Sequence, residues 1–165
     1  IVEQQDVDFM EFRFDEKQAD NAFHNFTFSN NRTITKSMLT WWAYAQAPQE
    51  LLSLETVLEI EHIFARNRQE HERSLKTPKN LEVLGNKALL EKRINIRASD
   101  YRFCDKVKYY KGYKNKRDQL KEGTNIAELI ELSEASDFTE HNIEQRNDAI
   151  ITAFIAYLRD QGLLL

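Results

Sequence analysis

Cysteine, proline and glycine are scarce in this sequence of 165 residues, which contains one Cys, two Pro and four Gly. The single Cys104 excludes a disulfide framework and a cysteine-based zinc site, and it is typical of a reducing compartment. So few Gly and Pro argue against a β-sandwich with many tight turns. Uninterrupted apolar runs are short, far below the roughly 18–20 residues of a membrane-spanning helix. We therefore expect a cytoplasmic protein without a membrane segment.

Length and composition favour one soluble domain. Hydrophobic residues make up 41% of the chain, enough for a core, and charged residues make up 30%. The chain begins Ile-Val-Glu rather than with Met, and no basic region followed by an apolar run indicates a signal peptide. We therefore expect a single C-terminal domain excised from a longer protein.

The net charge of −4 conceals a basic segment between Lys87 and Arg117. That segment holds eleven Lys and Arg against three acids, a local balance of +8, so the remainder carries −12. Tyrosines and a phenylalanine are interspersed among these cations. The pattern fits a surface that faces phosphates, and it equally fits a solvated lysine-rich helix.

Two segments have the apolar spacing of amphipathic helices. The spacing predicts a helix over 34–45, which Pro48 would end, and a longer one that carries Ile143, Ile150, Phe154 and Leu158 on one face. Asp137 and Glu140 form a candidate capping box for the longer helix, and Gly162 would close it. Periodicity leaves open whether the aromatic stretch at 7–14 is a strand or a helix edge.

The middle of the chain reads as strand, turn, strand, helix. TVLEIEHIF at 56–64 is rich in β-branched residues and predicts a strand, whereas 65–80 is polar and irregular. Gly85-Asn86 predicts a turn, and Ala88-Leu89-Leu90 a second strand. Ser99 is a candidate N-cap for a helix to about Tyr110, with Gly112 as its stop. After a loop, 125–132 predicts another helix.

Five residues in this segment have side chains that could take part in catalysis or bind a metal: Glu61, His62, Asn86, Asn95 and Lys106. A hairpin followed by a helix can fold the helix start over the first strand, so that imidazole, carboxylate and amide oxygen meet at one hard cation. Neighbouring residues on a regular strand point to opposite faces, however. Glu61 and His62 share a site only if the strand ends or bulges there.

These segments resemble a known family. IEHIF at 60–64, LGNKALL at 84–90, Asn95 and Phe103-Cys-Asp-Lys106 are similar to the HNH nuclease domain, also called the ββα-metal or His-Me finger. More specifically, they resemble the version at the C-terminus of GmrSD-type modification-dependent restriction proteins. IEQRNDAIITAFIAYL at 143–158 resembles that family's closing helix. The resemblance covers roughly 58–158.

The resemblance implies a mostly helical α+β domain with an embedded ββα-metal finger. We expect a helical flank at 1–55, the finger at about 56–112 and further helices at 113–165. His62 matches the general base that activates water, and Glu61 and Asn95 match ligands of one Mg²⁺ or Mn²⁺. Asn86 matches a residue that orients the imidazole, and Lys106 matches a lysine that we place against a phosphate.

The implied function is metal-dependent hydrolysis of DNA in a prokaryotic restriction protein that acts on foreign or modified phage DNA. An NTP-hydrolysing regulatory region N-terminal to this chain would control cutting. One face of the predicted helix, with Arg102, Lys106, Tyr109 and Tyr113, would turn toward DNA, while Phe103, Val107 and Tyr110 pack inward. The expected DNA contacts are Arg93, Arg97, Arg102, Lys106, Lys108 and Tyr109.

Two residues depart from the family pattern. Ala65 replaces a proline that stiffens the exit from the first strand, and Lys87 stands where an apolar residue is usual. Two alternatives therefore stay open: a nucleic-acid-binding or interaction module whose nuclease site has decayed, and a nuclease that acts on RNA.

Overall fold

A computed structural model describes residues 13–45 and 49–165. Its elements in chain order are α1 (Glu16–Asn25), α2 (Thr33–Ala45), β1 (Leu58–His62), α3 (Arg66–Glu72), the 3₁₀ turns η2 (Pro78–Glu82) and η3 (Leu84–Asn86), β2 (Lys87–Glu91), α4 (Lys92–Ala98), α5 (Phe103–Lys111), β3 (Tyr113–Lys114), β4 (Leu120–Lys121), α6 (Ala127–Leu132) and α7 (Glu140–Asp160). The domain is α+β, as the sequence predicted. Pro48 and the aromatic stretch from Val7 to Phe12 lie outside the described residues.

Two small antiparallel sheets hold the strands. β1 pairs with β2 over five residues, from Leu58 opposite Glu91 to His62 opposite Lys87, and β3 pairs with β4. Helix α2 packs on β2, and α4 contacts both strands of the first sheet and α5. The predicted order of strand, turn, strand and helix is therefore present, and β1 ends at His62.

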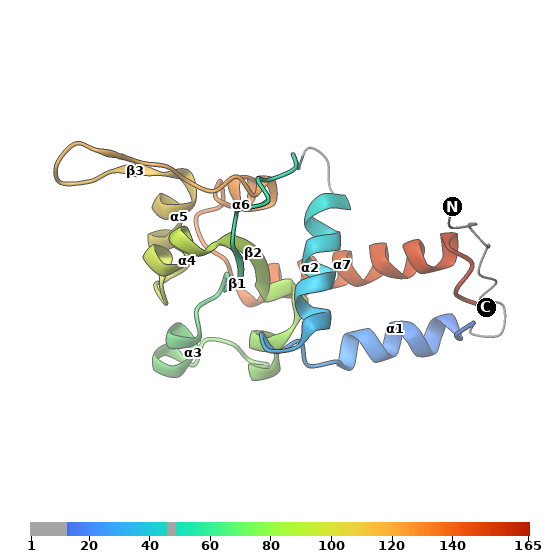
Figure 1. Cartoon of the computed structure of the whole chain (residues 1–165). Coiled ribbons are helices and arrows are strands. Elements are labelled where there is room, and N and C mark those ends of the chain that lie inside the picture. Colours follow the sequence, from blue (N-terminus) through green and yellow to red (C-terminus); the bar gives the residue numbers. More distant parts are fainter. Residues whose placement is uncertain (1–12, 46–48) are drawn as a thin grey trace, which may run out of the picture.

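The long helix α7 links the region of η3 with α1. It packs against η3 at its start and against α1 along its later turns, and Figure 1 shows these two helices side by side. Its apolar face enters the core with Ile143, Ile150, Ile151 and Ile155, as the 3.6-residue period predicted. The β3–β4 hairpin projects from the opposite end of the molecule (Figure 1). Within the described part of the chain, no helix is both long and apolar enough to cross a membrane.

Three local predictions are wrong for identifiable reasons. Ser99 does not cap the start of a helix: with φ of 46° it ends α4, its N–H bonding to the Asn95 carbonyl at 2.9 Å. The capping box of α7 is formed by Thr139 and Asn142, because the helix begins at Glu140, two residues later than a box of Asp137 and Glu140 requires. The Asp137 carboxylate binds Arg68. The segment after β1 is not irregular throughout, since α3 begins at Arg66.

Candidate active site at the end of strand β1

The last two residues of β1 point to opposite faces of the sheet. Regular pairing continues through Glu61 opposite Ala88 and His62 opposite Lys87, so no bulge turns the two side chains together. Glu61 contacts α5, whereas His62 contacts β2 and the turn before it. The expected convergence of carboxylate and imidazole therefore does not occur, and the two sides of β1 form separate polar clusters.

We call the first set the His62 cluster: His62, Lys87, Glu82, Asn30 and Arg66. The Lys87 Nζ lies 3.1 Å from His62 Nε2, 2.7 Å from Glu82 Oε2 and 2.5 Å from Asn30 Oδ1. The other Glu82 oxygen accepts from Arg66 at 2.6 Å and lies 3.5 Å from Nε2. The Lys87 side chain is 0% exposed and His62 is 12% exposed, so only the imidazole and the outer members reach solvent.

These contacts indicate which ring nitrogen of His62 carries the proton and whether the ring is charged. An ammonium has three N–H groups and no acceptor, and Lys87 directs them to three acceptors, of which Nε2 is one. Nε2 therefore accepts, and the ring proton is assigned to Nδ1. Burial, reinforced by the positive charge of Lys87, lowers the pKa of His62 to about 4. The imidazole is thus neutral at pH 7, as a base must be before it takes a proton.

The second set, the Glu61 cluster, consists of Glu61, Lys106 and Tyr110. Lys106 Nζ and the Tyr110 hydroxyl both donate to Glu61 Oε1, each at 2.6 Å, and Lys106 also donates to the His62 carbonyl at 2.6 Å. Burial raises the pKa of Glu61, and the charge of Lys106 opposes that shift. The cluster therefore fixes the end of β1 from the face opposite the imidazole.

The position of Lys106 corrects one prediction. Its side chain is 1% exposed, and the buried stripe of α5 is Phe103, Lys106 and Tyr110. Spacings of three and four residues place these three side chains on one face of the helix. The cation is directed inward because the buried Glu61 carboxylate needs a partner. Lys106 therefore faces the buried Glu61 carboxylate and not the solvent-exposed side of α5, where a phosphate would lie.

Asn86 holds the chain just beyond His62. Its Oδ1 accepts from the Phe64 N–H at 2.7 Å, and its Nδ2 donates to the carbonyls of Phe64 and Leu81 at 3.1 and 3.2 Å. Its own carbonyl accepts from the Ile63 N–H at 2.9 Å. The loop that leaves β1 is therefore fixed by one buried amide, although a role for Asn86 in a reaction stays a prediction.

Asn95 lies on α4 and contacts a different carboxylate from the one expected. Its Nδ2 donates to Glu59 Oε2 at 2.9 Å, and Lys92 lies 3.6 Å from the other oxygen of Glu59. Glu61 meanwhile is engaged by Lys106 and Tyr110. Across residues 13–45 and 49–165, no three His, Cys, Asp or Glu side chains gather as a metal site. The arrangement of Glu61 and Asn95 does not fit the predicted metal centre.

The other predicted DNA contacts lie at or near the surface of α4 and α5. Arg93 pairs with Glu122 at 2.9 Å, Arg97 donates to the Glu122 carbonyl at 3.0 Å, and Arg102 pairs with Glu72. Lys108 lies 4.9 Å from the ring centre of Tyr109, which stacks on Tyr101. Cations and phenol rings therefore share this surface, and their contact with DNA stays a prediction.

Sequence reasoning missed four members of the His62 cluster: Lys87, Glu82, Asn30 and Arg66. Lys87 was visible only as a departure from the family pattern. The register of the hairpin is the signal that identifies it, because the residue opposite His62 must lie on the same face. Asn30 lies in the connection between α1 and α2, and no spacing in the sequence relates it to β1.

Comparison with protein families gave a match over most of the chain. The family described as GmrSD restriction endonucleases, C-terminal domain, matches residues 13–153. No curated protein and no solved structure matched the chain in the same comparisons.

Proposed function

Because the chain belongs to the family of C-terminal domains of GmrSD restriction endonucleases, we propose that it is an endonuclease domain that hydrolyses DNA phosphodiester bonds with His62 as the general base. One observation carries the proposal. A neutral, half-buried imidazole stands at the end of β1, beside the cations of Lys87 and Arg66. The neutral imidazole can accept a proton from water, and the adjacent cations attract an anionic phosphate, whose negative charge would raise the low pKa of His62 toward the working pH.

The cluster suggests how the base becomes available. Nε2 accepts a bond from Lys87 in the structure, so this lone pair must be released before it can take a proton. A phosphate oxygen is a stronger acceptor than imidazole for an ammonium. The Lys87 side chain is 0% exposed, so bound DNA would free Nε2 only by drawing Arg66 and Glu82 apart and admitting a phosphate oxygen to the Lys87 ammonium.

The reaction that follows is an ordinary hydrolysis. The oxygen of a water molecule attacks phosphorus while its proton passes to Nε2 of His62, and the bond from phosphorus to the 3′ oxygen breaks. The departing oxygen takes a proton from solvent. Arg66, with 51% of its side chain exposed, would offset the charge that develops on the phosphate, and the buried charge of Lys87 would act from behind the imidazole. The Lys106 bond to the His62 carbonyl would hold the base in place.

A divalent metal is a separate prediction that rests on the family resemblance. Neither Glu61 nor Asn95 presents its side chain as expected for Mg²⁺ or Mn²⁺, and no step above depends on a metal. The same resemblance supports the wider setting: a prokaryotic restriction protein in the cytoplasm, acting on modified phage DNA under control of an N-terminal NTP-hydrolysing region.

A second candidate follows from the same contact. The bond from Lys87 occupies the lone pair that a base needs, and it favours a nucleic-acid-binding domain whose nuclease site is silent. Such a domain would bind DNA as the first candidate does, and it would never cut.

A nicking assay separates the two candidates. Supercoiled plasmid and a matched RNA are incubated with the protein and Mg²⁺, Mn²⁺ or EDTA, beside His62→Asn and the control His71→Asn, an exposed histidine on α3. Nicking of DNA that His62→Asn loses and His71→Asn keeps would support the proposal. Nicking that survives in His62→Asn would remove the base assignment. DNA binding without cutting under any condition would favour the silent module, and cutting of RNA alone would identify an RNA nuclease.

A further inference from the structure

The connection from α5 to α6 contains a projecting hairpin, which we call the hairpin arm (residues 113–121). It consists of β3, β4 and the turn between them, and Figure 1 shows it extending beyond α4 and α5 into solvent. Its one large apolar side chain after Tyr113, Leu120, is 70% exposed. The arm therefore contributes little to the core of the domain.

Hydrogen bonds nevertheless give the arm a defined shape. Asn115 organises the turn: its Oδ1 accepts from the N–H groups of Arg117 and Gln119 at 2.9 and 3.0 Å, and its own N–H donates to the Gln119 carbonyl at 3.0 Å. At the base, Gly112 has φ of +84° and packs against Gly123, where a Cβ would lie 2.8 Å from the Gly123 nitrogen. The arm is thus a built element with a fixed exit from α5.

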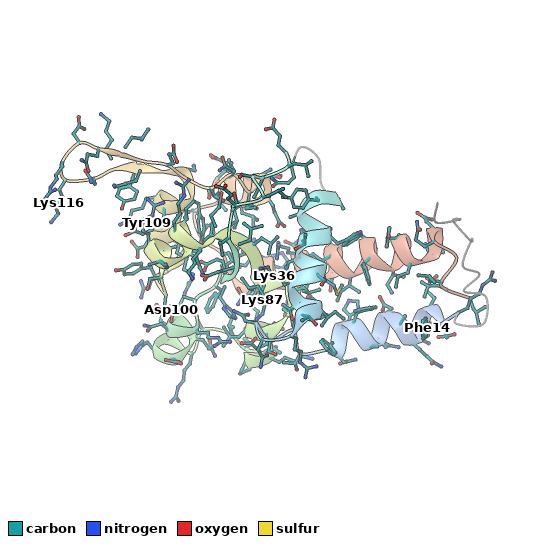
Figure 2. The ribbon with its side chains drawn as sticks, in the orientation of Figure 1. Phe14, Lys36, Lys87, Asp100, Tyr109 and Lys116 are labelled. Atoms are coloured by element: carbon teal, nitrogen blue, oxygen red, sulfur yellow. The ribbon has the colours of Figure 1, made fainter. Side chains whose placement is uncertain are left out.

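The charge of the arm is strongly positive. Four cations stand against one acid, a balance of +3: Lys114, Lys116, Arg117 and Lys121 against Asp118. Lys114 Nζ lies 3.1 Å from Asp118 Oδ1, and because both side chains are well exposed this ion pair is weak. Lys116 lies at the far tip in Figure 2, widely separated from Lys87 of the His62 cluster.

The base of the arm continues the basic surface of α4. Arg97 lies 5.9 Å from the ring centre of Tyr113, and Arg93 pairs with Glu122 just beyond β4. Tyr113 also packs edge-on against Tyr109 at 5.3 Å. Cations therefore follow one another from α4 to the tip of the arm.

We propose that the hairpin arm is a second contact for duplex DNA, binding its phosphate backbone at a distance from the bond that His62 attacks; the inference rests on the proposed function. Exposed cations without an apolar docking face suit phosphates, which are contacted without reading of sequence. Four residues from Gly112 to Lys116 span about 13 Å at roughly 3.3 Å per residue. This reach corresponds to about four base pairs at roughly 3.4 Å each.

The test compares two triple variants of the whole chain that remove equal charge. Lys114→Gln/Lys116→Gln/Arg117→Gln alters the arm, and Arg13→Gln/Lys17→Gln/Lys76→Gln alters exposed positions elsewhere. Binding of labelled duplexes of about 30 and about 8 base pairs is measured across a salt series, because each lost phosphate contact changes the slope by about 0.9. Cleavage of plasmid is followed separately.

We expect the arm variant to bind the long duplex at least about tenfold more weakly than the control variant, with a salt slope smaller by about two to three units. The difference in affinity between the two variants should be smaller for the short duplex, because the arm extends beyond its end. Equal binding by the two variants, or a loss of affinity that is independent of duplex length, would overturn the proposal that the hairpin arm contacts DNA. An arm effect without His62-dependent cleavage contradicts the catalytic proposal alone, and wild-type protein that binds no duplex contradicts both.

Discussion

Lys87 donates to His62 from the position directly opposite it in the sheet, with 3.1 Å between Nζ and Nε2. Strand pairing alone places these two side chains on one face, and burial brings the charge of one close to the ring of the other. The Lys87 cation, held by Glu82, therefore selects the tautomer of the imidazole and adds to the effect of burial on its charge.

Replacing Lys87 should change the titration of His62. Lys87→Met keeps the aliphatic volume and removes a positive charge, so the pKa of His62 should rise from about 4 toward its ordinary value of 6.5. Burial, the larger cause, remains, and the rise should be partial. NMR titration of the ring protons measures it, with Lys79→Met on η2 as an exposed control. Identical curves for the two variants would show that Lys87 does not act on His62.

The ion pair between Glu61 and Lys106 should matter for folding. Lys106→Met leaves a buried carboxylate without its cation, and we expect the free energy of unfolding to fall by about 3–5 kcal/mol. The exposed pair of Lys111 and Glu134 is the control, because Lys111→Met should cost no more than about 1 kcal/mol. Denaturant unfolding measures both variants. Adding Glu61→Gln to Lys106→Met should restore stability, and a further loss would contradict the pairing.

Gly85 lies directly against α7. A Cβ at this position would lie 2.0 Å from the Ile143 carbonyl oxygen and 2.7 Å from the Asn147 Cβ. Gly85→Ala must therefore displace helix backbone, and we expect a loss of about 3 kcal/mol or more, at the upper end for overpacking. Gly162→Ala, where the position has φ of +70° and open space, should cost only about 1–2 kcal/mol. Thermal unfolding that ranks the two variants in the reverse order would contradict this contact.

Glu128 should make stability depend on pH. Burial alone would raise its pKa, but the charge and hydrogen bonds of Arg146, with a bond from Trp42, lower it below the usual value of 4.5. A lowered pKa means that the stabilisation is present above the unfolded pKa and is lost as pH falls through the folded value. The difference in unfolding free energy between wild type and Glu128→Gln should therefore shrink below about pH 4.5. A constant difference would indicate that the carboxylate titrates normally.

Local patterns in the sequence predicted the elements that depend on local physics. β-Branched residues mark β1, Gly85 and Asn86 mark the turn, and the 3.6-residue period marks α7. The helices α3 and α4 escaped prediction because α3 (RNRQEHE) has no apolar residue, and the apolar residues of α4, Ile94, Ile96 and Ala98, alternate with polar ones as in a strand. Ser99 was misassigned for that reason: a missed helix ends where a new one was expected to begin.

The site was only partly predictable because its contacts depend on tertiary packing. The motif located His62 and Asn86, and the structure places both at the exit of β1. It could not show that Lys106 turns inward, since its charge suggested solvent and only the buried Glu61 makes that orientation favourable. Nor could spacing show that Asn30, 57 residues before Lys87, completes its set of acceptors.

Arg146 on α7 donates to the carbonyls of Leu84, Gly85 and Lys87 at 2.7–3.0 Å and pairs with Glu128 on α6. The turn that carries Asn86 and Lys87 is thus held by a residue about sixty positions later in the chain. The strands β1 and β2 with α4 therefore do not form a self-contained structural unit. If residues 56–112 alone were grafted into another protein, the turn would lose its hydrogen bonds from Arg146. The smallest segment that keeps these bonds extends through α7.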